Sequence, residues 1–182
     1  MKKQALIEEL KGLTASQQAR LIQIKKEDAT DLNFKPSPDS WSALECIAHL
    51  NYYGNFYIPE VRARLEKSIP SEEQNFKSGL LGNYFAQLMK PEGKKMKTFK
   101  AANPAGSSLD NTVLTKFEQQ LNSWLEILNS LKQVNLNKVK TSTSLSKWIK
   151  LKLGDTLRVV IYHNERHLQQ AEKAILAAKS TD

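Results

Sequence analysis

The segment GDTLRVVIYHNERHLQQAEKAILAAK, residues 154–179, carries its apolar residues along one face at helical spacing. Together with the preceding leucine, the members of this face are Leu153, Leu157, Val160, Ile161, Leu168, Ala171 and Ile175. A helix with one apolar face must pack against other elements. His163 and His167 lie one turn apart at the edge of this face. Asn164 falls inside it, where a polar side chain needs a partner.

Three further segments have the pattern of long helices. Residues 2–28 repeat leucine and isoleucine near one face, and Thr14 with Gln17 resembles a capping box at which this helix could restart. Residues 42–68 begin with the capping-box sequence SALE. Residues 109–131 carry a broad apolar stripe. We therefore predict an all-α fold, a four-helix bundle with long crossover connections.

The connections between these helices differ in character. Residues 28–40 contain two prolines and should form a loop, and residues 80–89 could form a short helix. Residues 134–152 read as a crossover rich in Lys, Ser and Thr, from which Trp148 and Ile149 should pack onto the bundle. Gly154-Asp155 should end that segment and cap the last helix.

Length and composition indicate one globular protein. A chain of 182 residues, with 40% hydrophobic and 25% charged residues, fits a single domain over residues 1–182. No apolar run has the length needed to span a bilayer and the amino terminus does not resemble a signal peptide, so we expect no membrane partner. A single cysteine excludes an internal disulfide, and a reducing cytoplasm fits best.

The chain is basic, with a formal net charge of +8. Such a surplus can attract nucleic acid, anionic lipid or an anionic small molecule. The lysines are spread along the chain, with a denser run in the loop Lys90–Lys100. A solvated surface is the favoured interpretation, because charge alone reads no base sequence, and a nucleic-acid partner is the less favoured one.

The histidines suggest a metal site. The chain has one other histidine, His49. It lies at the edge of the apolar face of its own predicted helix, as His163 and His167 do on theirs. Three neutral imidazoles would leave a position open for water, as in catalytic zinc sites. Nickel, iron, manganese and copper also accept imidazole, so the ligands do not choose the metal.

Other residues near the histidines allow two interpretations each. The metalloprotease motif needs glutamate directly after its first histidine, where this chain has Asn164. Glu45, one turn before His49, could support that histidine or only cap its helix. Cys46 fits a buried structural cysteine better than a nucleophile. Tyr53 could line a pocket or belong to the core.

Two stretches resemble a known family. Residues 41–50, WSALECIAHL, resemble the W-S-x-x-E-x-x-x-H-L signature of the DinB/YfiT-like superfamily, and residues 163–170, HNERHLQQ, resemble its H-x-x-x-H-L-x-Q element. The resemblance implies a four-helix bundle with long crossovers and a divalent metal held by His49, His163 and His167. Some members are metal-dependent thiol S-transferases and others are classed as hydrolases or isomerases. Dimers are frequent.

The favoured hypothesis is a cytoplasmic enzyme that depends on a divalent metal, zinc or nickel. It would transfer a low-molecular-weight thiol to an electrophilic small molecule, or hydrolyse a small substrate through metal-bound water. The alternative is a non-catalytic, metal-binding stress-response protein that acts through a partner. The candidates for a supporting or pocket role are Glu45, Cys46, Tyr53 and Asn164.

Overall fold

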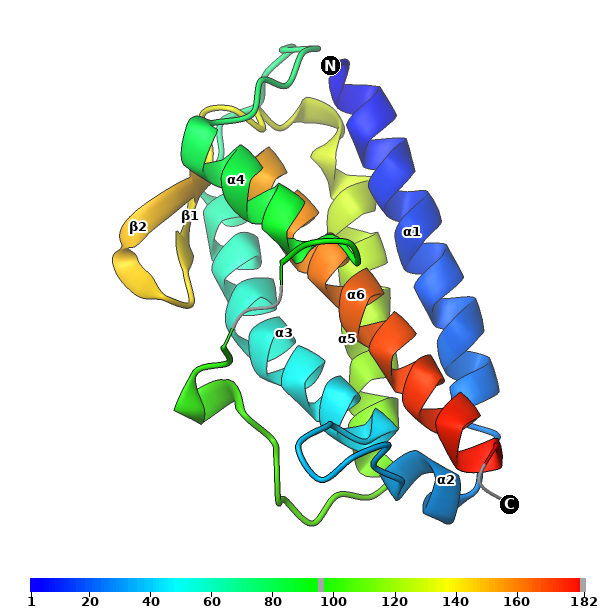
Figure 1. Ribbon diagram of the computed structural model, residues 1–182. Coiled ribbons are helices and arrows are strands. Elements are labelled where there is room, and N and C mark those ends of the chain that lie inside the picture. Colours follow the sequence, from blue (N-terminus) through cyan, green and yellow to red (C-terminus); the bar gives the residue numbers. More distant parts are fainter. Residues whose placement is uncertain (95–96, 181–182) are drawn as a thin grey trace.

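The computed structural model describes residues 1–94 and 97–180, which are mainly helical with a small two-stranded sheet (Figure 1). The long helices are α1 (Lys3–Ile24), α3 (Ala43–Glu66), α5 (Thr112–Asn129) and α6 (Leu153–Lys179). The shorter elements are α2 (Ala29–Asn33), α4 (Leu80–Met89), the 3₁₀ turns η1 (Lys100–Ala102) and η2 (Ser130–Gln133), and strands β1 (Lys140–Thr143) and β2 (Ser146–Lys152). The predicted helical class is confirmed, and the sheet is an addition to it.

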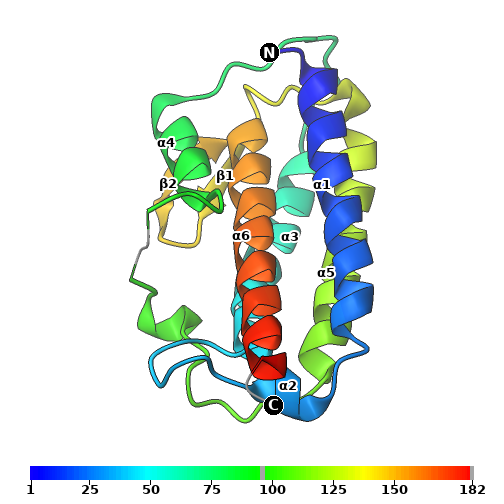
Figure 2. The same ribbon diagram turned by 45° about the vertical axis from the view of Figure 1, so that its right-hand side comes forward.

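The four long helices lie side by side. Helices α1 and α3 each pack against both α5 and α6. In Figure 1, α1 and α6 run in one direction and α3 and α5 run in the other, and Figure 2 shows the same arrangement turned by 45°. The connection between α3 and α5 therefore crosses the length of the molecule, and it carries α4, which packs on α6. The connection between α5 and α6 stays at one end.

The core consists of two clusters stacked along the helices. One cluster joins the beginnings of α1 and α6 to the later part of α3, and its largest buried members include Leu6, Leu10, Phe76 and Trp124. The other joins the end of α1, the beginning of α3 and the later part of α6, and includes Leu21, Leu44, Ile47 and Phe117. Burying an apolar side chain of this size contributes roughly 1.5–3 kcal/mol, so these clusters hold the helices together.

The capping box predicted for the second long helix is present at the start of α3. The Ser42 hydroxyl accepts a hydrogen bond from the Glu45 amide at 3.2 Å, and the Glu45 carboxylate accepts one from the Ser42 amide at 2.9 Å. Two amides that would otherwise lack partners are satisfied, which fixes where α3 begins.

The restart that the sequence allowed within the first helix does not occur, because α1 continues without a break through Gly12. The two residues of the supposed capping box have other partners. The Thr14 hydroxyl donates to the Leu10 carbonyl at 2.8 Å, and the Gln17 amide donates to the Ile161 carbonyl of α6 at 3.0 Å. Gln17 therefore links two helices instead of starting one.

The predicted cap of the last helix was wrong. The N-cap residue of α6 is Lys152, and Gly154 and Asp155 lie inside the first turn. The Asp155 carboxylate accepts hydrogen bonds from the Gly79 amide at 2.9 Å and from the Ser78 hydroxyl. Asp155 thus ties the segment before α4 to α6.

The segment predicted as a plain crossover contains the β-hairpin. Strands β1 and β2 pair antiparallel, with Thr141 opposite Leu151, and the Ser142 amide donates to Glu60 of α3 at 2.7 Å. Leu151 is buried, but Trp148 is 83% exposed, so the prediction that Trp148 packs onto the bundle was wrong. Side chains alternate along a strand, and position 148 lies on the face opposite to 151.

The remaining differences are small. Residues 28–40, predicted as loop, include the short helix α2. Among the described residues, no helix is both long and apolar enough to cross a membrane.

Candidate metal centre

The packing of α3 against α6 brings the three histidines of the chain together. His49 comes from α3, and His163 and His167 come from adjacent turns of α6. One ring nitrogen from each histidine lies within 4.8 Å of those of the other two. Residues that are far apart in sequence therefore form one compact group of nitrogen donors.

The distances within this group suit a single cation. His49 Nε2 lies 3.2 Å from His163 Nε2. Two nitrogens bound to one tetrahedral zinc ion at ~2.0–2.1 Å lie about 3.4 Å apart. A hydrogen on His163 Nε2 can occupy the space between the two nitrogens, and a divalent cation can replace it. The His167 ring is close to both, with centroid distances of 4.6 Å to His49 and 4.5 Å to His163.

Hydrogen bonds to the Nδ1 atoms of His49 and His167 determine which ring nitrogen of each histidine keeps a lone pair for a metal. His49 Nδ1 lies 2.7 Å from the Ala102 carbonyl oxygen, and His167 Nδ1 lies 2.9 Å from the Gln170 side-chain oxygen. Both oxygens only accept, so each Nδ1 carries the hydrogen and each Nε2 of the neutral ring keeps its lone pair. Metal-ligating histidines have the same outer hydrogen bond.

Burial keeps the three rings neutral. Burial lowers the pKa of His49, although its hydrogen bond to Ala102 acts in the opposite direction. Burial and the neighbouring His167 and His49 lower the pKa of His163 well below its ordinary value. Burial and His49 lower the pKa of His167 to about 3. Neutral imidazole is the form that binds a metal, so the group is already in that form near neutral pH.

Two aromatic side chains enclose the histidines. The Trp41 ring lies 4.8 Å from His49 and 5.7 Å from His167, and the Tyr53 ring lies 5.0 Å from His49 and 4.8 Å from His163. Burial raises the pKa of Tyr53 to about 12, so its phenol stays neutral. Tyr53 was a pocket candidate from the sequence. Trp41 was not, although its place at the start of the WSxxE stretch was a usable signal.

Glu45 does not contact the histidines directly but holds the segments around them. Besides completing the capping box with Ser42, its carboxylate accepts from the Gly106 amide at 3.1 Å and pairs with Lys35 at 2.8 Å. Gly106 follows closely after Ala102, the hydrogen-bond partner of His49. The capping role foreseen for Glu45 is present, and the same carboxylate also anchors the loop that orients His49.

The two remaining candidates from the sequence, Cys46 and Asn164, are both buried. Cys46 is fully buried in the core, and burial raises the pKa of its thiol, so it is a poor nucleophile. Asn164 is buried on α6 next to His163. Glu165 pairs with Arg20 of α1 at 2.6 Å and is not available as a base for the histidines.

The basic loop Lys90–Lys100 passes close to the histidine-bearing helix. Arg166 donates to the Leu88 carbonyl at 2.9 Å and to the Lys94 carbonyl at 3.2 Å, which holds the start of this loop on α6. Residues 95–96 of the loop lie outside the described part of the chain. The contact with Arg166 is structural and assigns no ligand to the loop.

Comparison with known proteins points to one family. A family model described as the DinB superfamily matches residues 13–171, a span that includes all three histidines. No curated protein and no solved structure matches the chain.

Proposed function

This chain belongs to the DinB superfamily, and we propose that it is an enzyme that depends on a divalent metal held by His49, His163 and His167. One observation carries the proposal. The hydrogen bond from His49 Nδ1 to a backbone carbonyl leaves its Nε2 unprotonated and 3.2 Å from that of His163. Any buried histidine needs an acceptor for its N–H, but here three histidines also bring one ring nitrogen each to within 4.8 Å of the other two, which is the arrangement of metal ligands.

We propose that α1, α3, α5 and α6 form a four-helix bundle that carries this site, and that the long connections between them are its crossovers. We take residues 1–182 as a single domain. A cytoplasmic location fits the single free cysteine, which is kept reduced there. A homodimer is a reasonable assembly for such a bundle, and size-exclusion chromatography with light scattering would measure it.

Zinc and nickel are the proposed metals, because both accept three neutral imidazoles. Bound at this site, either ion supplies a Lewis acid that favours the ionised form of a thiol or of water. The protein contributes the orientation of the rings, through Ala102 and Gln170, and an aromatic enclosure.

The surroundings of the histidines favour transfer of a low-molecular-weight thiol to an electrophilic small molecule. The rings that pack on the histidines belong to Trp41 and Tyr53, and the nearby carboxylates of Glu45 and Glu165 are engaged in other contacts. Trp41 and Tyr53 can pack against the apolar part of a substrate and exclude water. The neutral Tyr53 phenol can donate a hydrogen bond to it. Hydrolysis of a small substrate is the alternative reaction at the same residues.

Metal content tests the first part of the proposal. Protein purified without an affinity tag should contain about one divalent ion per chain by elemental analysis, as expected for one three-histidine site. His163→Ala should remove it, whereas Tyr53→Phe, which keeps every ring nitrogen, should not. Protein without stoichiometric metal, or an unchanged metal content in His163→Ala, would contradict the proposal.

A non-catalytic metal-binding protein that acts through a partner is the second candidate. It is favoured by the buried state of Cys46 and by the ion pair of Glu165, which leave these two groups unsuited to catalysis. A screen with several thiols and electrophiles, and with esters and amides, separates the two candidates. Turnover that is lost in His49→Ala excludes the non-catalytic function.

A further inference from the structure

Helix α4 and the hairpin leave large apolar side chains in solvent. Leu80 is 96% exposed, Tyr84 is 61% exposed and Trp148 is 83% exposed, and Leu81 and Leu145 are also exposed. Single exposed apolar residues are common on protein surfaces, but a group of them marks an interaction surface. None of these residues is among the aromatic side chains that pack on the histidines, and none has a part in the function proposed above.

The exposed residues of the two elements belong to one surface. The Lys152 ammonium group, at the end of β2, donates to the Lys77 carbonyl at 2.6 Å, just before α4. Trp148, Lys150 and Lys152 share one face of β2, because side chains alternate along a strand. At ~3.3 Å per residue, Trp148 stands on the order of 13 Å from Lys152 along the strand. Figure 1 shows the first turn of α4 beside the end of β2.

The two segments that carry this surface are basic. Residues 74–91 contain two lysines, residues 134–152 contain five, and neither segment contains an aspartate or glutamate. Among the described residues, none of these seven lysines forms an ion pair with a carboxylate. Lys140 lies opposite Lys152 in the hairpin, where like charges repel. Alternation places Lys147 on the opposite face of β2, but its ammonium group lies 5.4 Å from the centre of the Trp148 ring and so borders the same surface.

We propose that this surface, formed by Leu80, Leu81, Tyr84, Lys147, Trp148 and Lys150, docks onto the surface of an anionic lipid bilayer. Tryptophan and tyrosine favour the interface between headgroups and acyl chains, leucine enters its apolar side, and lysine binds anionic headgroups. The sequence argument against a membrane partner concerned segments that span the bilayer. Peripheral docking needs none.

The charge and the side-chain types of this surface favour an anionic bilayer over a second copy of the chain and over nucleic acid. A second copy of the chain on the same surface would place lysines against lysines. Nucleic acid would use the lysines, but aliphatic Leu80 has no partner on a phosphate backbone. A bilayer that contains anionic lipid complements both the charge and the apolar side chains.

Sedimentation with vesicles tests the proposal on the full-length protein. The protein should bind vesicles of mixed phosphatidylcholine and phosphatidylglycerol, should not bind phosphatidylcholine alone, and should be released by salt. Of the three tryptophans, Trp124 is buried and Trp41 is half-buried, whereas Trp148 is 83% exposed. Docking should therefore shift tryptophan emission to shorter wavelength, and Trp148→Phe should abolish most of the shift.

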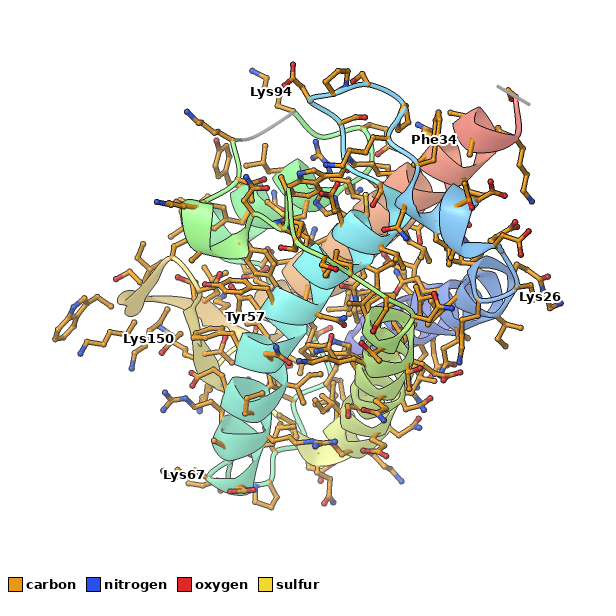
Figure 3. The ribbon with its side chains drawn as sticks, turned by 90° about the horizontal axis from the view of Figure 1, so that it is seen from below. Lys26, Phe34, Tyr57, Lys67, Lys94 and Lys150 are labelled. Atoms are coloured by element: carbon orange, nitrogen blue, oxygen red, sulfur yellow. The ribbon has the colours of Figure 1, made fainter. Side chains whose placement is uncertain are left out.

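Matched variants separate specific docking from general charge and hydrophobicity. Lys147→Gln with Lys150→Gln should weaken vesicle binding about 25-fold, since each lysine near an anionic surface contributes a factor of about five. Lys26→Gln with Lys116→Gln removes the same charge elsewhere and should have little effect; Lys26 and Lys150 lie at opposite sides of the molecule in Figure 3. Leu80→Ser should weaken binding about tenfold, unlike Leu176→Ser, which alters an exposed leucine near the end of α6.

Several outcomes would overturn the proposal. Absence of binding to anionic vesicles would do so, as would equal losses in the two pairs of lysine variants. Binding of double-stranded DNA that depends on Lys147 and Lys150 but not on Leu80 would identify a polyanion site instead. A dimer of the wild-type protein that Leu80→Ser converts to a monomer would show that a second copy covers this surface.

Discussion

Glu45 joins three segments that surround the histidines, through Ser42, Gly106 and Lys35. Burial opposes ionisation of this carboxylate, but the hydrogen bonds from Lys35 and the two amides outweigh it and lower its pKa below the ordinary value of 4.5. A carboxylate with a lowered pKa in the folded state stabilises the fold above its unfolded pKa. The stabilisation is lost as the pH falls through the folded value.

We expect Glu45→Gln to lower the free energy of unfolding by ~1–3 kcal/mol near neutral pH, because charged hydrogen bonds are lost. The difference from the wild type should shrink as the pH falls below 4.5, where the wild-type carboxylate becomes protonated. Urea unfolding across this pH range measures both effects. Glu8→Gln is the control, since Glu8 is exposed and its partners Gln4 and Lys11 lie on the same helix. A difference that persists unchanged at low pH would refute the ionic contribution.

Replacement by alanine should have opposite effects on stability at Gly154 and at Gly12. A Cβ atom on Gly154 would lie 2.4 Å from the ring of buried Phe76, whereas one on Gly12 would have no neighbour within 4 Å. Gly154→Ala should therefore destabilise the protein by ~1–3 kcal/mol through overpacking. Gly12→Ala, in the exposed interior of α1, should stabilise it by ~0.5–1 kcal/mol. Melting temperatures that move in the same direction for both variants would contradict this account of Gly154.

At the residue scale, the sequence indicated side chains but not their backbone partners. His49, His163 and His167 could be singled out because histidines at the edges of apolar faces are visible in the sequence. The carbonyl of Ala102 could not, since every residue has a carbonyl and only the fold shows which one is near His49. Trp41 stood in the sequence only as the first residue of the WSALECIAHL stretch, and its ring packs on two histidines.

At the scale of elements, the attachment of α4 to α6 depends on buried Asp155. Its carboxylate accepts from the Gly79 amide and the Ser78 hydroxyl, and Arg158 lies 3.4 Å away. Asp155→Ala would leave these donors without their acceptor. Breaking a buried charged pair costs about 3–5 kcal/mol, so this change should destabilise the fold. It should also release α4 before the long helices open.

Hydrogen–deuterium exchange measures this release. The amides of residues 80–89 should exchange faster in the variant, by a larger factor than those of α5. Asp155→Asn keeps an oxygen acceptor and the side-chain volume, so it provides an intermediate variant should Asp155→Ala fail to fold. Asp39→Ala, in an exposed loop, is the control. Equal acceleration in α4 and α5 would show that Asp155 supports the whole fold and not this attachment.

An element could be predicted from the sequence where the residues that stabilise it are close together in the chain. The start of α3 could be predicted because Ser42 and Glu45 satisfy each other within one turn. The hairpin of residues 140–152 could not, because its strands are short, rich in Lys, Ser and Thr, and lack a clear alternation. They are held by each other and by Glu60 of α3, which is distant in sequence.

At the scale of the whole molecule, the site depends on which helices are neighbours. His49 and His163 are separated by 114 positions, and periodicity alone does not state that α3 packs on α6. The resemblance to a family supplied that pairing, and the structure brings the three histidines together. An ion bound by His49, His163 and His167 would link α3 to α6 and so stabilise the fold as a whole.

A ligand that binds only the folded state raises its stability by an amount set by concentration. Zinc or nickel at about 100 times the dissociation constant should add roughly 2.7 kcal/mol. At about 2–4 °C per kcal/mol for a chain of this size, the melting temperature should rise by about 5–10 °C. Differential scanning calorimetry of chelator-treated protein, with metal added stepwise, measures the rise. Tyr53→Phe should retain it and His163→Ala should lose it. If His163→Ala kept the full rise, the ion would be binding elsewhere on the chain, and the link between α3 and α6 would not be the source of the stability.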